Sequence, residues 1–343
     1  MAPRTLALFL IAIAFVAVAC EGDGNSSLTS NNAPSEVIAF GAQTSDGDGL
    51  YIVRPDGSGL QLLQSELDLV SSPVWSPDGG RIAYLVGAGE LAALRVFDFD
   101  TRTATTVSLS AVTNQAGRAA SWSPDGRRLA FTEAEGQDRR IGVYDVEREE
   151  AFDFPRVIGA EPDWSPDGDE LAFVRAGEGS GLFVMGADGD APEELRIEPP
   201  VRLQAPLWSP DGTQLVVTGG ETGDETLLLV ERETGAVTGP GAGQHPSWSP
   251  DGTQLAFSAR SPDGDTDLDI YFIAAAGGAL QPISQAVTRE LWPTWSPDGA
   301  RVAFLSQADR QTAFLCVVRP RPEERDCLNL PGVLPATPAW SPR

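Results

Sequence analysis

Trp75-Ser76-Pro77-Asp78-Gly79 is the stretch of sequence that decides the fold, because this phrase recurs along almost the whole chain. Successive tryptophans of the phrase are 40 to 47 residues apart, which is the period of a four-stranded blade in a β-propeller. The repeat therefore predicts an all-β propeller. Complete copies begin at Trp75, Trp122, Trp164, Trp208, Trp248 and Trp295, and a shortened copy, Trp-Ser-Pro, begins at Trp340.

Each copy of the phrase predicts a tight turn between the first and second strands of a blade. Proline presets φ at one turn position, aspartate favours the next, and glycine accepts the left-handed conformation. A short apolar run follows each turn, such as Leu129-Ala130-Phe131, and its alternation places large side chains on one face and alanine on the other. Both faces of a blade are therefore apolar. We expect the repeat tryptophans in the core and the repeat aspartates as backbone caps.

The two ends of the repeat array predict how the ring closes. Residues 37–40 match the second strand of a unit, but no copy of the phrase precedes them. The missing first strand is supplied by residues 336–341, which contain the shortened copy. We therefore predict a seven-bladed β-propeller of four-stranded antiparallel blades, as a single domain over residues 36–343. The C-terminal strand completes the first blade and leaves no free edge.

The full motif resembles the repeat of the TolB-like, WD-repeat-like family of bacterial propellers, in which Pro-x-Trp-Ser-Pro-Asp-Gly precedes an Ile/Leu-Ala-Phe strand. The resemblance runs from about Val37 to Pro342, and proline stands two residues before each tryptophan except at Ala120. TolB itself is a soluble periplasmic protein with six blades and an extra N-terminal domain, so its partners do not carry over to seven units. The same repeat forms the propellers of prolyl-oligopeptidase-like peptidases and oligogalacturonate lyases. The resemblance thus implies a fold more than a function.

The N-terminus predicts export and a lipid anchor. Residues 1–19 combine a basic start, an apolar stretch and small residues, which is the pattern of a secretory signal peptide. The residues 17–20, Ala-Val-Ala-Cys, resemble a bacterial lipobox, whose cysteine, here Cys20, is lipidated. An ordinary signal peptide with an incidental cysteine is the alternative. Residues 20–35 are polar, so we expect a flexible tether that holds the protein at the cell membrane, on its periplasmic or extracellular side.

The charge of the chain restricts its partners. It carries 24 basic residues, all arginine, against 49 acidic ones, for a formal net charge of −25. The field of such a molecule repels nucleic acid and anionic lipid headgroups. A partner with basic patches, or a divalent cation, is favoured, and the membrane is reached through the lipid anchor only.

Cys316 and Cys327 are the other two cysteines, and they flank a Pro- and Glu-rich turn in the last unit. If the strands around this turn pair symmetrically, the two side chains face one another. Export permits oxidation, so we predict a disulfide, which stabilises by about 2 to 3 kcal/mol in the chain-entropy account. Two buried free thiols are the alternative.

The inventory for catalysis is thin. The chain has one histidine and no Gly-x-Ser-x-Gly elbow, so a hydrolase triad of the oligopeptidase type has no nucleophile site. It also has no Cys/His cluster for zinc and no lysine for a phosphate-binding loop. Oligogalacturonate lyases bind metal with several histidines, and the one histidine of this chain cannot substitute for them. We therefore expect a protein that is not an enzyme, although a glycosidase pair of carboxylates would not show in the sequence.

Topology indicates which face binds a partner. The loops from fourth to first strand and from second to third strand emerge opposite the repeat turns, and variable loops usually carry binding residues. Trp292 is the one tryptophan outside the repeat, and His245 holds the equivalent place one unit earlier. The alternative is that Trp292 plugs the channel and His245 caps a loop. Our candidate recognition residues at the channel mouth are Arg118, Glu161, Gln204, Gln244, His245, Arg289, Glu290 and Trp292.

The densest run of carboxylates lies in one second-to-third-strand loop, at Asp263, Asp265, Asp267 and Asp269. Hard oxygen ligands suit Ca²⁺, so this loop is the candidate metal site. An EF-hand is excluded, because Leu268 replaces its glycine and Ala274 replaces its closing glutamate. A looser calcium-binding loop and a solvated Asp/Gly hairpin are the two interpretations, and no other cofactor is expected.

These features favour a non-catalytic, membrane-tethered monomer that acts as a scaffold for an envelope protein or peptide. Two alternatives belong to other classes. One is a propeller that binds or cleaves cell-surface glycans through loop carboxylates and Trp292. The other is the accessory propeller of a separately encoded peptidase.

Overall fold

The computed structural model divides the chain into Met1–Ser30 and Asn31–Arg343, and the structure describes part of the second unit. Described are residues 34–342 except 45–46, 88–90, 113–117, 119, 137, 153, 176–180, 198–201, 222–223, 261–266, 284–287, 310–311, 320–324, 329 and 331–332. The predicted signal peptide, Cys20, most of the tether, Asp263 and Asp265 lie outside the described residues. Within these residues, no helix has the length and apolar character needed to cross a membrane.

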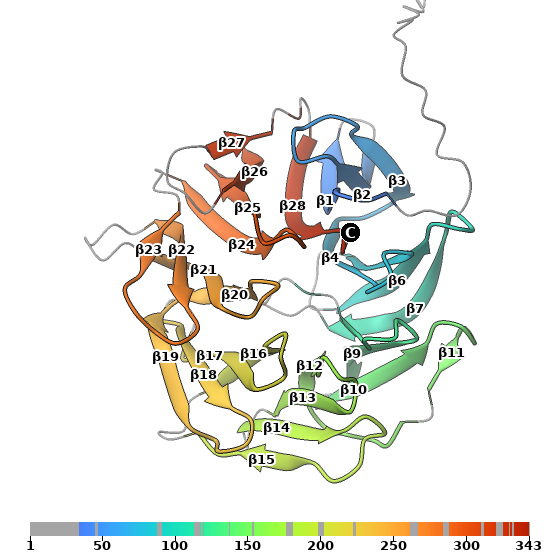
Figure 1. Cartoon of the computed structure of the whole chain (residues 1–343). Coiled ribbons are helices and arrows are strands. Elements are labelled where there is room, and N and C mark those ends of the chain that lie inside the picture. Colours follow the sequence, from blue (N-terminus) through green and yellow to red (C-terminus); the bar gives the residue numbers. More distant parts are fainter. Residues whose placement is uncertain are drawn as a thin grey trace, which may run out of the picture. The chain divides into compact units, whose positions relative to one another are not determined.

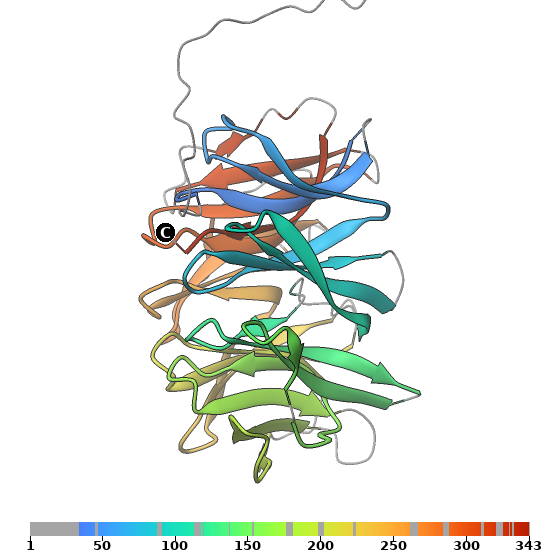
Figure 2. The same ribbon diagram turned by 90° about the vertical axis from the view of Figure 1, so that its right-hand side faces the viewer.

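The described strands form seven groups of four antiparallel strands, which we call blades one to seven. Figure 1 shows the blades side by side in a ring, and Figure 2 shows the same ring from the side, with the strands running between two loop-bearing faces. Blades two and three are joined into one eight-stranded sheet, because Ala111 pairs with Glu133. The predicted all-β propeller of four-stranded antiparallel blades is confirmed.

The strands of each blade are given from the centre of the ring outward. Blade one consists of β28 (Val333–Trp340), β1 (Ile38–Thr44), β2 (Gly47–Val53) and β3 (Gln61–Glu66). Blade two consists of β4 (Val70–Trp75), β5 (Arg81–Val86), β6 (Leu91–Asp98) and β7 (Thr103–Val112), and blade three of β8 (Ser121–Trp122), β9 (Arg128–Glu135), β10 (Asp138–Asp145) and β11 (Glu150–Ala151). Blade four consists of β12 (Ala160–Trp164), β13 (Glu170–Arg175), β14 (Gly181–Gly186) and β15 (Glu193–Leu195), and blade five of β16 (Leu203–Trp208), β17 (Gln214–Gly219), β18 (Thr226–Glu231) and β19 (Val237–Ala242). Blade six consists of β20 (Gln244–Trp248), β21 (Gln254–Arg260), β22 (Leu268–Ala274) and β23 (Gln281–Pro282), and blade seven of β24 (Arg289–Trp295), β25 (Val302–Gln307), β26 (Ala313–Val318) and β27 (Arg325–Cys327).

The two ends of the propeller meet in blade one. Strand β1 pairs antiparallel with β28, with Ile38 opposite Trp340. Ser341 extends the junction, because its backbone N–H donates to Val37 O (2.8 Å) and its hydroxyl accepts from Val37 N (3.1 Å). The C-terminal strand therefore completes the first blade, as predicted, and joins the first and last parts of the ring.

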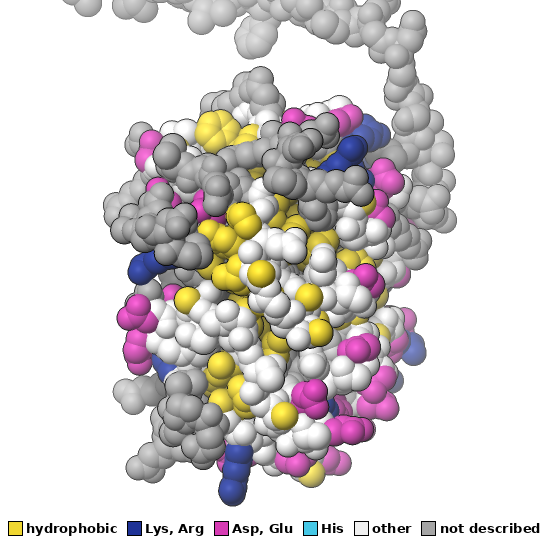
Figure 3. All heavy atoms as spheres, turned by 60° about the vertical axis from the view of Figure 1, so that its left-hand side comes forward, with side chains coloured by type: hydrophobic (Ala, Val, Ile, Leu, Met, Phe, Trp, Pro, Cys, Tyr) yellow, Lys and Arg dark blue, Asp and Glu magenta, His cyan; other side chains and the backbone are white. Residues whose placement is uncertain are grey.

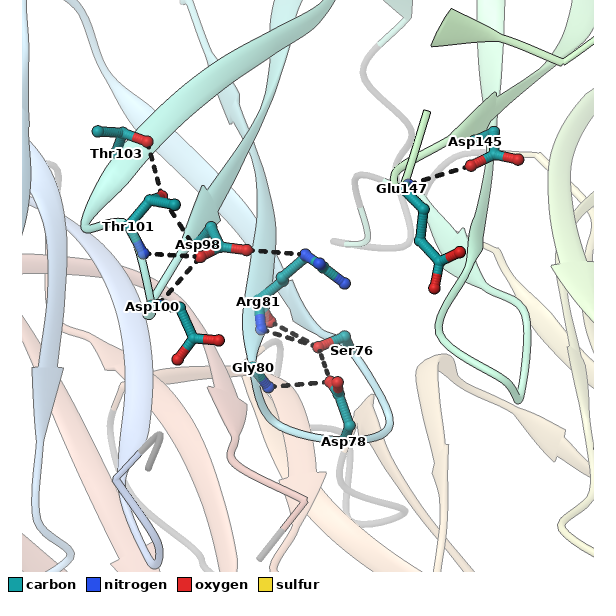
Figure 4. Close-up of polar contacts among 10 residues, drawn as sticks. All are labelled: Ser76, Asp78, Gly80, Arg81, Asp98, Asp100, Thr101, Thr103, Asp145 and Glu147. Carbon is teal, nitrogen blue, oxygen red and sulfur yellow. Dashed lines mark hydrogen bonds and ion pairs between the residues drawn. The ribbon is translucent and has the colours of Figure 1, made fainter. Parts of the chain in front are cut away.

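The repeat phrase forms the same capped turn in blade after blade. In blade two the Ser76 hydroxyl donates to Asp78 Oδ1 (2.6 Å), which also accepts from Gly80 N (2.9 Å), while Arg81 N donates to Ser76 Oγ (2.9 Å) (Figure 4). Gly79 takes the left-handed φ of 73°. Equivalent bonds from the serine hydroxyl lower the pKa of the turn aspartates Asp167, Asp211, Asp251 and Asp298. The repeat aspartates are backbone caps, as expected.

The repeat tryptophans fasten each blade to the one before it. The indole Nε1 of Trp75 donates to Ala339 O (3.1 Å) and that of Trp122 donates to Val74 O (3.1 Å). In the same relation stand Trp208 to Asp163 O (3.2 Å), Trp248 to Leu207 O (3.3 Å), Trp295 to Ser247 O (3.2 Å) and Trp340 to Thr294 O (2.9 Å). Trp164 departs from the rule, since its Nε1 is buried without a partner in the described part of the chain. A belt of hydrogen bonds thus runs around the inner strands, which the sequence did not reveal.

The core lies between the blades. Ile38 and Phe40 of blade one, for example, pack with Ala303, Leu315 and Val317 of blade seven. The predicted alternation holds, because both Ala303 and its neighbour Phe304 are fully buried, each against a different blade. Cys316 and Cys327 are joined by a disulfide that connects β26 to β27 at directly paired positions.

Candidate functional site at the central cavity

A cavity of about 340 Å³ lies among the inner strands of the propeller. Its wall is built mainly from the Pro-x-Trp segments of β4, β20, β24 and β28, with Leu207 and Trp208 of β16 and with Arg118 just before β8. The wall also extends to the repeat-turn residues Ser76 and Pro77 and to Pro342. The cavity therefore occupies the centre of the ring, where the starts of several blades meet. Such concave sites between repeated elements are the usual location of ligands.

Five inner strands, β4, β12, β16, β20 and β24, share a strained bulge beside this cavity. In each, the residue three before the repeat tryptophan takes a left-handed conformation with φ between 53° and 58°, although it is not glycine. Each of these inner strands also shifts its pairing register at this place. Such a conformation costs about 1 to 3 kcal/mol per residue, and a bulge re-aims the side chains around it. The residues are Ser72, Glu161, Ala205, His245 and Trp292.

Two of these strained residues form an aromatic pair on the cavity wall. The rings of His245 and Trp292 lie with their centroids 5.3 Å apart and their planes tilted by 49°. Trp292 Nε1 is buried and has no hydrogen-bond partner among the described residues. An indole N–H can only donate, so the described residues leave this buried donor unsatisfied.

A buried ion pair ties three blades together next to the cavity. Asp163 Oδ1 accepts from Arg118 Nη1 (3.0 Å) and from the Ser121 hydroxyl (2.9 Å), and its Oδ2 accepts from Trp208 N (2.9 Å). Burial raises the pKa of the Asp163 carboxyl, and the Arg118 charge opposes this shift. Arg118 is more open, with 39% of its side chain exposed against 6% for Asp163. The pair therefore fixes Arg118 from its buried side.

Glu161 bridges blades four and five. Its carboxylate accepts from the backbone N–H of Ala205, and its own N–H donates to Thr132 Oγ1 (2.7 Å). Burial raises the pKa of the Glu161 carboxyl. These bonds hold two of the strained residues against each other, so the structure gives Glu161 a positioning role. It does not belong to the described wall of the cavity.

The other candidate recognition residues are spread over the same strands. Glu290 on β24 is fully buried and accepts from Ile270 N (3.3 Å). Gln204 and Gln244 lie half-buried just before the bulges of β16 and β20, while Arg289 is exposed at the start of β24. Of the eight predicted residues, Arg118, His245 and Trp292 line the described cavity wall. The structure brings these three together and leaves the other five beside or behind them.

Asp163 is the residue beside the candidate site that sequence reasoning missed. It stands immediately before the repeat tryptophan, where the other units carry Val74, Ser121, Leu207, Ser247, Thr294 and Ala339. The signal in the sequence is an acidic residue at a position where the other units carry apolar or small ones. The hydrogen bond from Arg118 to Asp163 explains why this unit differs.

The predicted calcium loop is corrected in part. Asp269 lies within β22, opposite Ala259, and is only 5% exposed, so it is not a loop ligand. The strand already begins at Leu268, which is buried and extends the apolar run. Asp263 and Asp265 lie outside the described residues. In the part of the chain that the structure describes, no group of three or more potential ligands is gathered for a metal ion.

A second pocket of about 340 Å³ lies on the face of the repeat turns, between blades three and four. Arg127 at its edge pairs with Glu147 (2.5 Å), and Arg128 pairs with Asp188 (3.4 Å) and stacks over the Phe152 ring at 4.0 Å. These contacts satisfy the charged groups of the pocket within the protein. They account for this pocket as part of the turn scaffold.

Comparisons with known proteins agree on the architecture. A sequence model described as the TolB beta propeller domain matches residues 35–237 and 182–343. TolB from Acinetobacter baumannii is 19% identical, with a TM-score of 0.62, and the match covers 92% of this chain and 68% of that one. No curated protein matches the chain.

Two structures of enzymes share the fold as well. An oligogalacturonate lyase from Vibrio parahaemolyticus is 14% identical, with a TM-score of 0.65, and the match covers 83% of this chain and 86% of the lyase. The acylaminoacyl peptidase of Pyrococcus horikoshii is 15% identical, with a TM-score of 0.61 and coverage of 88% and 52%. At these identities the likeness shows a common fold alone.

Proposed function

The chain belongs to the TolB β-propeller family, and from that premise we propose that it is a non-catalytic lipoprotein of the cell envelope that binds a protein or peptide. The partner binds at the central cavity. The observation that carries the proposal is the pair of His245 and Trp292, two strained residues whose rings meet on the cavity wall.

Strain supports a binding role because it is costly. A left-handed non-glycine residue lowers stability, and such residues cluster at active sites and ligand clamps. At the same repeat position the chain carries Ser72, Glu161, Ala205, His245 and Trp292, so the backbone is kept while the side chain changes. A repeated backbone with varied side chains supplies a recognition surface on a rigid scaffold.

The non-catalytic part of the proposal comes from the residue inventory. The single histidine packs against Trp292, and a nucleophile would need a base within hydrogen-bond reach. The lyase and peptidase folds above therefore lend their architecture but not their chemistry. Binding is the function that the cavity residues support best.

The envelope location comes from the N-terminal sequence. A lipidated Cys20 gives the propeller a membrane anchor, and the polar residues that follow give it reach. The Cys20→Ala variant is expected to leave the membrane fraction for the soluble one. If that variant stays with membranes to the same extent as the wild type, the lipid anchor is wrong.

The binding proposal is tested by cross-linking in intact cells, followed by mass spectrometry of the captured proteins. Trp292→Ala is expected to lose the partner that the wild type captures, because it removes the larger ring of the aromatic pair on the cavity wall. Phe314→Ala is the matched control, since Phe314 is an exposed aromatic (43%) on β26. Equal capture by the wild type and Trp292→Ala would contradict the site. Capture of purified glycans in place of protein would transfer the function to a carbohydrate-binding class.

A further inference from the structure

We propose that the segment of the partner that enters the central cavity is acidic, and that Arg118 holds its carboxylate. This inference rests on the proposed function, because it names the chemical class of the group that the cavity takes. It also separates the cavity from the outer surface of the propeller, whose charge favours the opposite kind of partner.

The cavity wall has a charge unlike that of the rest of the protein. The chain carries 49 acidic and 24 basic residues, yet none of the described residues that line the cavity is acidic. Arg118 is the one permanently charged side chain among them. Arg118 is ion-paired with Asp163, but it is the cationic member of the pair that lines the cavity, so the wall favours an anion over a basic segment.

Arg118 is built to present its charge to the cavity. Asp163 is buried and distributes its negative charge over Arg118, the Ser121 hydroxyl and Trp208 N. The guanidinium is the more exposed partner of the pair, so it is nearer to an occupant than the carboxylate is. A guanidinium carries five donors in a planar fork, a geometry that matches a carboxylate. Asp163 is therefore a positioning residue and Arg118 the contact residue.

Trp292 supplies an apolar wall. Its Nε1 is buried, so the recognition of an anion falls to Arg118. Pro246 and Pro293 border the aromatic pair, and proline has no backbone N–H to offer. The wall thus favours an occupant with an acidic side chain next to an apolar one.

The acidic exterior does not prevent this binding. Figure 3 shows acidic side chains scattered over one side of the propeller, with apolar side chains between them. At physiological ionic strength, charges farther apart than about 8 Å are largely screened, whereas a contact with Arg118 inside the cavity is not. Basic residues elsewhere in the partner match the exterior, while the acidic segment matches the cavity.

The experiment is a selection of random, displayed peptides against the purified propeller, carried out in parallel with variants. The wild type is expected to enrich peptides with an acidic residue beside an apolar one, and Trp292→Ala is expected to lose them. Arg118→Gln is expected to lose the acidic preference and to bind the selected peptides about tenfold more weakly or worse, the effect of removing a charged hydrogen bond. Arg118→Lys keeps the charge and is expected to keep the preference.

Two further variants make the result independent of stability. Arg118→Gln together with Asp163→Asn removes both charges, so no lone buried charge remains to disturb folding, and it is expected to lose the acidic preference as well. Arg127→Gln removes an ion-paired arginine of the same blade that lies away from the cavity, and it is expected to behave as the wild type.

The two proposals fail in different ways. If no enriched peptide depends on Trp292, the binding site itself is wrong. If the enriched peptides depend on Trp292 but are neutral or basic, or keep their acidic residue with Arg118→Gln, binding at the cavity stands and the role of Arg118 is overturned.

Discussion

The two ends of the inner strands follow opposite rules. At the turn end, sequence and structure repeat together, since the same serine and aspartate cap the same glycine turn, as in Ser76 and Asp78. At the other end, where the left-handed bulges lie, the backbone repeats in five strands but the side chains differ, as His245 and Trp292 show. The comparison teaches that repetition in the sequence marks the scaffold. The proposed binding residues stand where the repeated backbone carries unrepeated side chains.

The largest expected effect lies in the scaffold. Trp208→Ala removes a buried indole and its hydrogen bond to Asp163 O, so it is expected to lower the free energy of unfolding by about 3 to 5 kcal/mol. Urea denaturation measures this. Phe314→Ala, on an exposed site, is expected to cost far less, and a similar loss for both variants would contradict the scaffold role of the tryptophans.

Substitutions at left-handed positions are expected to change stability in opposite directions at the two ends of the inner strands. Gly252 in a repeat turn has a φ of 70°, and a Cβ there would meet Pro210 at an ordinary contact distance of 3.5 Å. Gly252→Ala is therefore expected to lower the free energy of unfolding by about 1 to 2 kcal/mol through backbone strain alone. Ala205 has a φ of 54°, so Ala205→Gly is expected to be neutral or to stabilise by up to about 1 kcal/mol. Thermal and urea unfolding of the two variants test this, and a destabilising Ala205→Gly would refute the strain at the bulges.

A smaller effect is expected from acid. The pKa of the turn aspartates Asp167, Asp211, Asp251 and Asp298 lies below the ordinary 3.8, because serine hydroxyls donate to them. The unfolded chain then binds more protons near that pH, so their contribution is present above about pH 4 and is lost as the pH falls through the lowered values. Glu161 and Asp163, whose pKa is raised by burial, contribute with the opposite sign.

The measurement is the urea midpoint between pH 5 and pH 2.5. It is expected to fall with pH in the wild type and to fall less steeply in Asp251→Asn, which has no carboxylate to protonate in that turn. A midpoint whose pH dependence is the same in both proteins would show that the cap does not use the charged form.

Sequence and structure agree where local patterns decide the outcome. The ring closure follows from two observations. The unit that begins at residues 37–40 lacks a first strand, and the shortened copy at Trp340 supplies one strand with no unit after it. The pairing of the two segments confirms the closure. The turn caps followed from the chemistry of Ser-x-Asp-Gly. These features depend on residues that are close in the sequence or counted along it.

The cavity could be predicted only in part, because its contacts join different blades. Arg118, His245 and Trp292 were found from their places in the repeat, but Asp163 lies 45 residues from Arg118, and spacing alone does not show that they meet. The left-handed bulges also escaped, although the proline after each strained residue marks them. The run of aspartates places Asp269 in a loop by its charge, whereas the structure buries it within β22.

The central claim is that the partner binds at the bulge end of the inner strands, where Arg118, His245 and Trp292 line the cavity, and not at the turn end. A photo-cross-linking amino acid placed at Thr294 on the cavity wall, which leaves Trp292 in place, or at the exposed Asp169 beside a repeat turn, tests it in intact cells. The account predicts that the probe at position 294 captures the partner and that the probe at position 169 does not. Capture of the same partner from position 169, with none from position 294, would contradict the account.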